Sequence, residues 1–121
     1  MKLELQNTFL ESLSEMCEKS YATLAPAPEI LIFNASLAEE LNLSSLANNQ
    51  NKCTEIFSGR EVLKDSQPVA QAYSGHQFGH FNPALGDGRA LLLGESINTN
   101  GELRDIQLKG SGPTPFSRRG D

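Results

Sequence analysis

Two apolar segments joined by a short polar turn, close to the C-terminal end of the sequence, constrain the fold most strongly. Residues 89–95, RALLLGE, read as a strand and are followed by INTNGE. The Asn100-Gly101 pair in that stretch is typical of a type I′ turn, which joins two antiparallel strands. Residues 103–109, LRDIQLK, are then the return strand. The sequence therefore predicts an antiparallel hairpin over residues 89–109.

The return strand alternates between its two faces, because successive side chains of a strand point in opposite directions. Ile106 and Leu108 share one face and are expected to point toward a core. The opposite face carries the odd-numbered residues, which are Leu103, Asp105, Gln107 and Lys109. Lys109 is thus predicted to project on a polar face, away from the core.

Apolar residues recur at helical spacing in two segments further upstream. Residues 8–18, TFLESLSEMCE, predict an amphipathic helix with Asn7 or Thr8 as its cap. Residues 34–43 predict a second helix, with Ser36 as its cap.

The remaining stretches carry weaker signals. Two prolines keep residues 24–33 extended, residues 44–53 are expected to be a loop, residues 57–64 and 67–73 short helices, and residues 74–83 an irregular strand. Helices together with an antiparallel hairpin make α+β the expected fold class.

Length and composition fit one ordinary globular domain. The 121 residues are enough for a single core, and 38% of them are hydrophobic and 21% charged. No apolar run approaches the ~20 residues that cross a bilayer, and the N-terminus lacks the apolar stretch of a signal peptide. Cys17 and Cys53 form neither a disulfide framework nor a CxxC pair. A reducing, cytoplasmic setting without membrane association is therefore expected.

Charge is unevenly distributed along the chain. The net charge of -5 argues against a general nucleic-acid-binding surface. Residues 1–88 carry 5 basic and 11 acidic side chains, a balance of -6, whereas residues 89–121 carry 5 basic and 4 acidic side chains, a balance of +1. The positive groups thus gather in the last third of the chain, where an anionic ligand would be bound.

A glycine-rich stretch, GDGR, immediately precedes the predicted hairpin. Gly86 and Gly88 permit a close backbone approach to an anion, and the Arg89 guanidinium matches phosphate oxygens. Lys109, on the neighbouring strand, would add a second positive charge, an order of parts that protein kinases also use. Asp-Gly pairs also form ordinary turns, so the residues alone leave a phosphate loop and a plain turn open. The kinase pattern GxGxxG and the Walker motif are both absent.

Two histidines four residues apart raise the question of a metal site. His76 and His80 lie in GHQFGH and would share a face on a helix or on a single strand. Glycines beside both histidines oppose a helix, and the sequence offers no evident third ligand. Histidines that bond to backbone groups in a loop or edge strand are the favoured interpretation.

Several of these motifs occur together in one known family. The stretches YSGHQFGHFNPALGDGRALLLGE, residues 73–95, and DIQLKGSGPTPFSRRGD, residues 105–121, closely resemble the selenoprotein O family. The upstream stretch YATLAPAPEILIFNASLAEELNL, residues 21–43, is similar to the N-terminal segment of the same family. The resemblance covers nearly the whole chain.

The resemblance implies a protein-kinase-like fold and a protein adenylyltransferase, which moves AMP from ATP to Ser, Thr or Tyr hydroxyls of proteins. The cofactors it implies are ATP, bound in a flipped orientation, and Mg²⁺ or Mn²⁺. Gly86, Gly88 and Arg89 match the nucleotide-contacting glycine loop of the family. Lys109 matches the lysine that meets the ATP phosphates, and Asp121 matches an aspartate of the ATP site.

Family members are several times longer than this chain, and their catalytic base and metal ligands are expected downstream of residue 121. The chain is therefore expected to be a single incomplete domain and to be inactive alone. Residues 1–66 would form a helical and extended N-terminal segment, and residues 67–121 the start of a kinase-like N-lobe. A protein kinase on the same scaffold and a non-catalytic nucleotide-binding fragment remain the alternatives.

Overall fold

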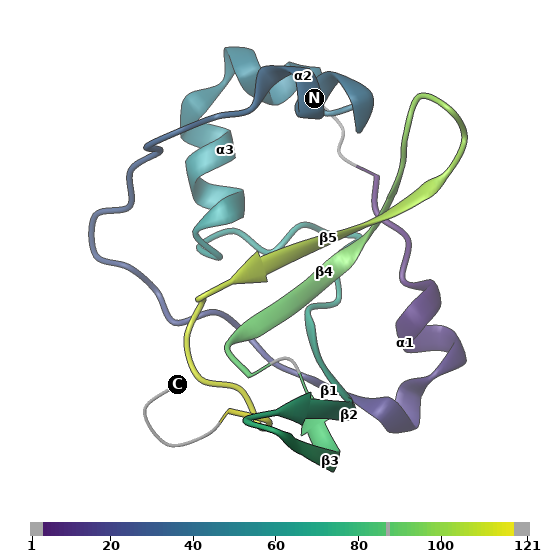
Figure 1. Cartoon of the computed structure of the whole chain (residues 1–121). Coiled ribbons are helices and arrows are strands. Elements are labelled where there is room, and N and C mark those ends of the chain that lie inside the picture. Colours follow the sequence, from purple (N-terminus) through teal and green to yellow (C-terminus); the bar gives the residue numbers. More distant parts are fainter. Residues whose placement is uncertain (1–3, 87, 118–121) are drawn as a thin grey trace.

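The structure is a computed structural model that describes residues 4–86 and 88–117 (Figure 1). Its helices are α1 (Thr8–Ser12), α2 (Ala35–Glu40) and α3 (Gln50–Phe57), with 3-10 turns at Ser14–Met16 and Ser44–Asn48. Its strands are β1 (Cys17–Lys19), β2 (Val69–Gln77), β3 (His80–Gly86), β4 (Ala90–Ile97) and β5 (Leu103–Lys109). The expected α+β class is confirmed.

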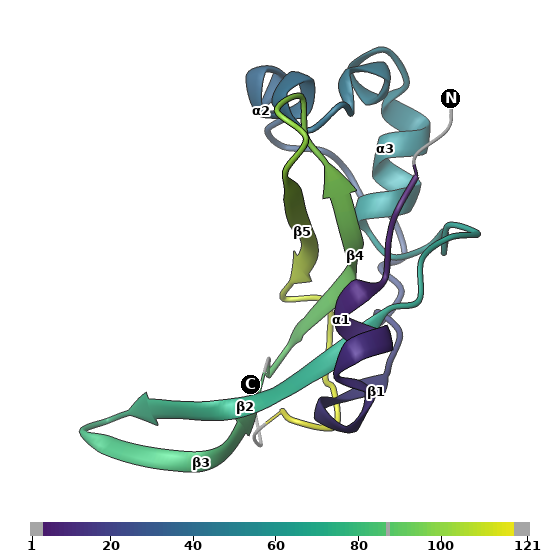
Figure 2. The same cartoon turned by 90° about the vertical axis from the view of Figure 1, so that its right-hand side faces the viewer.

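All strand pairs in the described residues are antiparallel. The main sheet has the order β1-β2-β4-β5, and β3 pairs only with β2. Strands β2 and β4 are paired at one position, Val69 opposite Leu92. Strand β2 stays paired with β1 as far as Gln71 and pairs with β3 from Ala72 onward. Figure 2 shows the β2–β3 hairpin projecting away from the end of the molecule that holds α2 and α3.

Two apolar clusters pack against the strands. The larger cluster joins α2, α3 and the turn between them to the sheet, through Leu46, Cys53, Ile56, Leu93, Ile106 and Leu108 among others. The smaller cluster contains Cys17, Val69 and Leu92, with Phe9 and Leu10 of α1 against it. Strand β4 supplies residues to both clusters and is buried along nearly its whole length.

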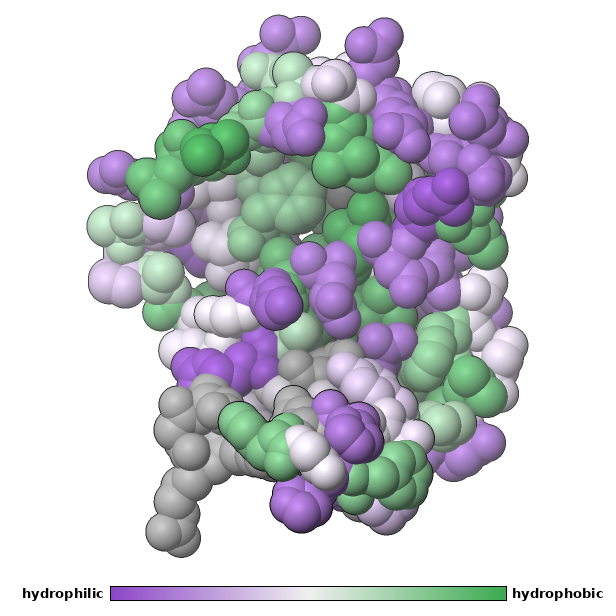
Figure 3. Space-filling model, in the orientation of Figure 1, coloured by the Kyte–Doolittle hydropathy of each residue, from purple (hydrophilic) through white to green (hydrophobic). Residues whose placement is uncertain are grey.

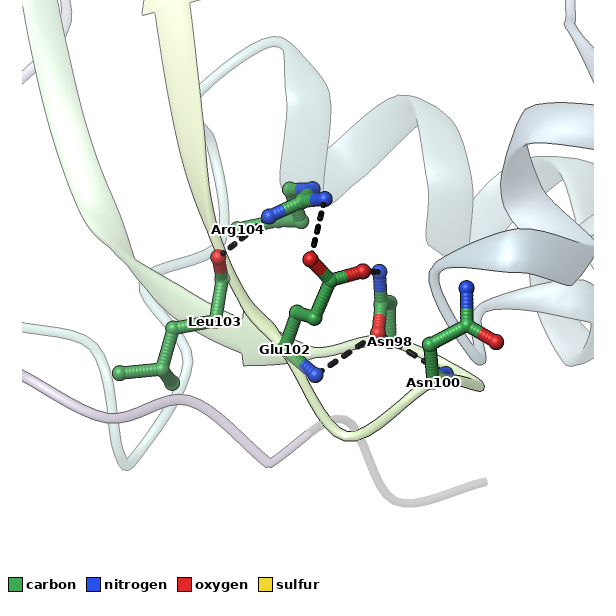
Figure 4. A network of polar contacts seen from close by, with 5 residues as sticks. All are labelled: Asn98, Asn100, Glu102, Leu103 and Arg104. Carbon is green, nitrogen blue, oxygen red and sulfur yellow. Dashed lines mark hydrogen bonds and ion pairs between the residues drawn. The ribbon is translucent and has the colours of Figure 1, made fainter.

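The predicted hairpin over residues 89–109 is confirmed, and so is the alternation of its return strand. Ile106 and Leu108 are buried, while the odd-numbered residues of β5 are exposed. The expected type I′ turn is wrong, because Gly101 has a φ of 78° but Asn100 does not have a positive φ. The side-chain oxygen of Asn98 instead accepts hydrogen bonds from the backbone N–H groups of Asn100 and Glu102, both at 2.9 Å (Figure 4). These two bonds stabilise a longer loop.

The expected helix over residues 67–73 is also wrong, because residues 69–73 form the first part of β2. Pairing with β1 on one edge and with β3 on the other outweighs the local helical pattern. The single irregular strand expected over residues 74–83 is wrong in part, because this stretch holds the end of β2, a turn and the start of β3. Its turn places Phe78 and Gly79 at φ values of 53° and 77°, and two positive values in succession are characteristic of a type I′ turn.

The helices upstream begin and end at other residues than predicted. Helix α1 is only five residues long. Residues 17 and 18, the last two of the predicted helix, instead belong to β1, because they pair with β2. The side chain of Asn34, not Ser36, caps α2 by accepting a hydrogen bond from the Leu37 N–H at 2.9 Å. The short helix expected over residues 57–64 is absent. Helix α3 ends at residue 57, which is the first residue of that stretch.

The stretch expected to be a loop, residues 44–53, holds a 3-10 turn and the first half of α3. The stretch expected to be extended, residues 24–33, indeed contains no helix or strand. Leu31 and Ile32 in that stretch are 90% and 91% exposed. Figure 3 shows hydrophobic side chains gathered over the segment that leads into α2, and a groove of about 590 Å³ lies between this segment and α3.

Glu95 connects β4 to the N-terminal helix. It is only 4% exposed, and its carboxylate accepts hydrogen bonds from the Thr8 N–H at 3.1 Å, the Thr8 hydroxyl at 2.5 Å and the Phe9 N–H at 3.0 Å. Glu95 thereby caps α1, in place of the side chains of Asn7 or Thr8 that the sequence predicted. Asn7 instead bonds to the backbone of residues 65 and 67. A negative charge at a helix N-terminus is favourable because the first N–H groups lack partners within the helix.

Replacing Glu95 by Ala is expected to lower the free energy of unfolding by about 3 kcal/mol, because three donors lose a charged acceptor at a buried site. Glu95→Gln keeps one acceptor oxygen and is expected to cost less. Urea denaturation followed by circular dichroism measures both. Glu102→Ala, at the exposed β4–β5 turn, is the matched control, and an equal loss in that control would contradict the role assigned to Glu95.

The β4–β5 turn also predicts a dependence on pH. The pKa of Glu102 is lowered from its ordinary value by the hydrogen bond from Asn98 and by the hydrogen bond and charge of Arg104, whose Nη2 lies 3.1 Å from the carboxylate (Figure 4). A lowered carboxyl pKa gives stability that is present above the ordinary pKa and is lost as the pH falls through the lowered pKa. We expect the unfolding free energy of Glu102→Gln to fall less on acidification than that of the wild type. Identical acid profiles for the two proteins would refute this.

Candidate functional site

The glycine-rich stretch connects β3 to β4. Gly86 is the last residue of β3, and Gly88 and Arg89 lead into β4 at Ala90. Asp87, between the two glycines, lies outside the described residues. We call Gly86, Gly88 and Arg89 the glycine loop.

Strand register places Lys109 beside this loop. Lys109 is directly opposite Ala90 in the β4–β5 ladder, and Ala90 directly follows Arg89 in the chain. The next residues of the chain hold the same end of the hairpin together, since the N–H groups of Gly110 and Ser111 donate to the Arg89 carbonyl at 2.9 and 3.1 Å. The β4–β5 hairpin thus brings Lys109 to the residue that follows Arg89, while Gly86 and Gly88 precede the hairpin in the chain. These are four of the five residues that the family resemblance matched to the nucleotide site. The fifth, Asp121, lies outside the described residues.

The two glycines of the loop serve different physical purposes. Gly88 has a φ of 64°, which side chains rarely permit. Its two chain neighbours aside, no atom of the described residues lies within 4 Å of the position that a Cβ would occupy. Gly86 is instead required by packing, because a Cβ there would lie 2.4 Å from the Gln71 carbonyl oxygen and 2.8 Å from the Phe116 Cβ. Gly88 therefore leaves open space beside the backbone, and Gly86 does not.

The two cations of the site are both exposed. Within the described residues, the Lys109 side chain has no hydrogen bond or ion pair to another residue. Gly110, directly after it, has a φ of 77° and also has open space where a Cβ would lie. An exposed ammonium beside two glycines with open space suits an anion such as a phosphate group.

Sequence reasoning missed the residues whose hydroxyls form hydrogen bonds to the backbone of the glycine loop. Residues 110–117 return to the loop, and the Ser117 hydroxyl donates to the Gly88 carbonyl at 2.8 Å. The Thr114 hydroxyl donates to the same carbonyl oxygen. The only signal for these contacts is the run of small and hydroxyl residues GSGPTPFS after Lys109.

The sequence led us to expect His76 and His80 on one face of a helix or of a single strand. In the structure they lie on opposite faces. His76 pairs with Phe81 and His80 with Gln77 across the β2–β3 hairpin. Residues directly opposite each other point to the same face, so neighbouring pairs put His76 and His80 on opposite faces. Among residues 4–86 and 88–117 no group of three His, Cys, Asp or Glu side chains is placed to hold a metal ion.

The thiols are not part of this site. Cys17 and Cys53 are both free and buried, and burial raises the pKa of each thiol, with the Glu15 charge adding to the effect at Cys17. A raised pKa keeps a thiol protonated and unreactive at neutral pH. Neither cysteine is therefore a candidate nucleophile. No helix in the described part of the chain is long and apolar enough to cross a membrane.

Comparison with known proteins shows what the whole chain is similar to. A protein named "Protein nucleotidyltransferase YdiU" from Chromobacterium violaceum is 58% identical over 96 residues, which cover 79% of this chain and 20% of that protein. Proteins of the same name from Agrobacterium fabrum and Ruegeria sp. are 53% identical over 117 residues and 46% identical over 121 residues. These matches cover 93% and 100% of this chain, and 24% and 25% of the relatives.

The chain thus spans about a quarter of the length of the curated relatives it matches. The family described as "Protein adenylyltransferase SelO" matches residues 1–121, which is the full sequence. The chain belongs to the SelO family of protein adenylyltransferases, whose curated relatives are named as nucleotidyltransferases.

Proposed function

We propose that this chain forms the phosphate-binding part of an ATP-dependent protein adenylyltransferase, which transfers AMP from ATP to Ser, Thr or Tyr hydroxyls of proteins. The observation that carries the proposal is the register pair between Ala90 and Lys109. It sets beside the glycine loop a lysine whose side chain has no partner among the described residues. Membership of the SelO family supports the reaction class. The same membership supports the assignment of the β4–β5 hairpin to a kinase-like N-lobe.

The residues present fit the phosphates of ATP. Open space beside Gly88 and Gly110 lets phosphate oxygens approach the backbone, and the Lys109 ammonium and the Arg89 guanidinium supply positive charge. Asp121, which lies outside the described residues, is assigned to the same site on the family resemblance alone. Mg²⁺ or Mn²⁺ would supply further charge neutralisation when bound.

In this reaction the acceptor hydroxyl oxygen forms a bond to the α-phosphorus of ATP. The bond from that phosphorus to the oxygen of the β-phosphate breaks, pyrophosphate leaves with the electron pair, and the hydroxyl proton passes to a base. Lys109 and the glycine loop would hold the β- and γ-phosphates and stabilise the charge that develops on them. Gly88 and Arg89 would fix the orientation of ATP that exposes the α-phosphate to the acceptor.

The base and the metal ligands are assigned to the part of a full-length family member that this chain does not match. The chain covers about a quarter of the length of its relatives. We therefore expect residues 1–121 to bind nucleotide without transferring it. A reducing, cytoplasmic setting is supported by the two free thiols.

Two measurements test the proposal, and the first concerns binding. Lys109→Ala is expected to raise the Kd of the chain for Mg-ATP about tenfold or more, because a charge-assisted hydrogen bond contributes about 1.5–3 kcal/mol. Lys64→Ala removes an exposed lysine elsewhere on the surface and is the matched control. Isothermal titration calorimetry measures all three proteins, and equal affinities would remove Lys109 from the site.

The second measurement separates AMP transfer from phosphate transfer. A full-length protein that carries this segment is supplied with ATP labelled at either the α- or the γ-phosphate. Protein-bound α label, lost in Lys109→Ala, is the expected result. Label from the γ-phosphate alone would identify a kinase, and no label from either would identify a nucleotide-binding protein without transferase activity. Transfer by residues 1–121 alone would contradict the assignment of the base elsewhere.

A further inference from the structure

The segment after β5 returns to the glycine loop and holds it on one side. The Gly88 carbonyl accepts hydrogen bonds from two hydroxyls, those of Thr114 and Ser117. The Arg89 carbonyl accepts from the N–H groups of Gly110 and Ser111. A carbonyl oxygen has two lone pairs, so two donors satisfy each of these acceptors.

The two hydroxyls are themselves held in place. The Ser117 hydroxyl accepts a hydrogen bond from the Thr114 N–H at 2.7 Å, and the Thr114 hydroxyl accepts one from the Phe116 N–H at 3.2 Å. The Ser117 N–H also donates to the Thr114 carbonyl at 3.0 Å, which closes a tight turn. Each hydroxyl oxygen therefore accepts one hydrogen bond from a backbone N–H, and each hydroxyl donates its own hydrogen to the Gly88 carbonyl oxygen. We call residues 114–117 the loop-supporting turn.

The same turn packs against the other glycine of the loop. Phe116 lies so close to Gly86 that a Cβ on Gly86 would be 2.8 Å from the Phe116 Cβ. One short turn thus contacts both ends of the glycine loop, by packing at Gly86 and by hydrogen bonds at Gly88.

These hydrogen bonds determine how the backbone of the loop is oriented. A peptide unit is planar and trans, so its C=O and its N–H point in opposite directions. Two donors on the Gly88 carbonyl fix the rotation of the peptide that joins Gly88 to Arg89. Glycine has many accessible backbone conformations, and Gly88 occupies one of them, at a φ of 64°. Without the two hydroxyls this peptide would be free to rotate, and binding a ligand would have to restore the order.

We propose that Thr114 and Ser117 are positioning residues, whose hydroxyls hold the glycine loop in the conformation that binds the phosphates of ATP. The proposal rests on the proposed function, because it assigns these residues to the same site. They act through the Gly88 carbonyl and need not touch the nucleotide.

The test uses variants that remove a hydroxyl while keeping the size of the side chain. Thr114→Val and Ser117→Ala are each expected to raise the Kd for Mg-ATP about fivefold, since one hydrogen bond contributes about 1 kcal/mol. Thr114→Ser and Ser117→Thr retain the hydroxyl and are expected to restore affinity to within about twofold of the wild type. Ser45→Ala, which removes an exposed hydroxyl from the 3-10 turn between α2 and α3, is the matched control.

A second readout reports on the loop without nucleotide. Amide hydrogen exchange at residues 88–90 and 110–111 is expected to be faster in Thr114→Val/Ser117→Ala than in the wild type, and unchanged in Lys109→Ala. In a full-length protein that carries this segment, the double variant is expected to raise the KM for ATP and to leave the KM for the acceptor protein unchanged. A general loss of folding would change both values.

The outcomes separate this proposal from the proposed function. If Lys109→Ala weakens ATP binding but the hydroxyl variants do not, the positioning role is wrong and the phosphate site stands. The same conclusion follows if exchange in the loop is unaffected by the double variant. If the wild-type chain does not bind ATP while the double variant exchanges faster, the turn supports the loop but the phosphate-binding role of both is overturned.

Discussion

The burial of β4 on both of its faces is the constraint on which the rest of the structure depends. Leu93 packs into the cluster beneath α2 and α3, and Leu92 packs into the cluster that includes Phe9 and Leu10 of α1. A strand buried on both faces reads as a continuous apolar run and not as an alternation. The sequence ALLL of β4 has this character, so other elements have to pack against both faces of the strand.

One polar residue in that buried strand determines where the N-terminal cover sits. Glu95 can be buried only if its charge is satisfied by hydrogen bonds, and the first turn of α1 provides three donors. Within the described residues, every buried side-chain nitrogen or oxygen has a hydrogen-bond partner. The position of α1 therefore follows as much from the needs of one carboxylate as from the apolar side chains of the helix.

The elements that the sequence predicted well are those whose signals are local. The two strands of the β4–β5 hairpin, the faces of Ile106 and Leu108, and the position of Lys109 all follow from alternation and from a turn-forming pair. The type of that turn did not follow, because Asn98, two residues before Asn100, competes for the backbone N–H groups. The type I′ geometry occurs instead at Phe78-Gly79, where only one residue is a usual turn former.

The elements that the sequence predicted poorly depend on residues distant in the chain. Residues 67–73 have a pattern compatible with a helix, but strand partners at residues 17–19 and 80–86 decide the outcome. The cap of α1 is 87 residues away from Thr8. The partners of Gly88 are 26 and 29 residues away, and nothing in the residues GDGR indicates them. Family resemblance, and not spacing, indicated Asp121 and the identity of the transferred group.

The glycine loop illustrates why a motif alone could not be interpreted. A plain turn and a phosphate loop both need Gly88 at a positive φ, so the letters GDG do not distinguish them. What distinguishes them is the surrounding structure. A plain turn has no need of a lysine across the ladder whose side chain lacks partners among the described residues, or of two hydroxyls on one carbonyl. Both surround this loop. Fixing the backbone before the ligand arrives reduces the entropy that binding must remove, and this is the physical reason to read the loop as a site built for an anion.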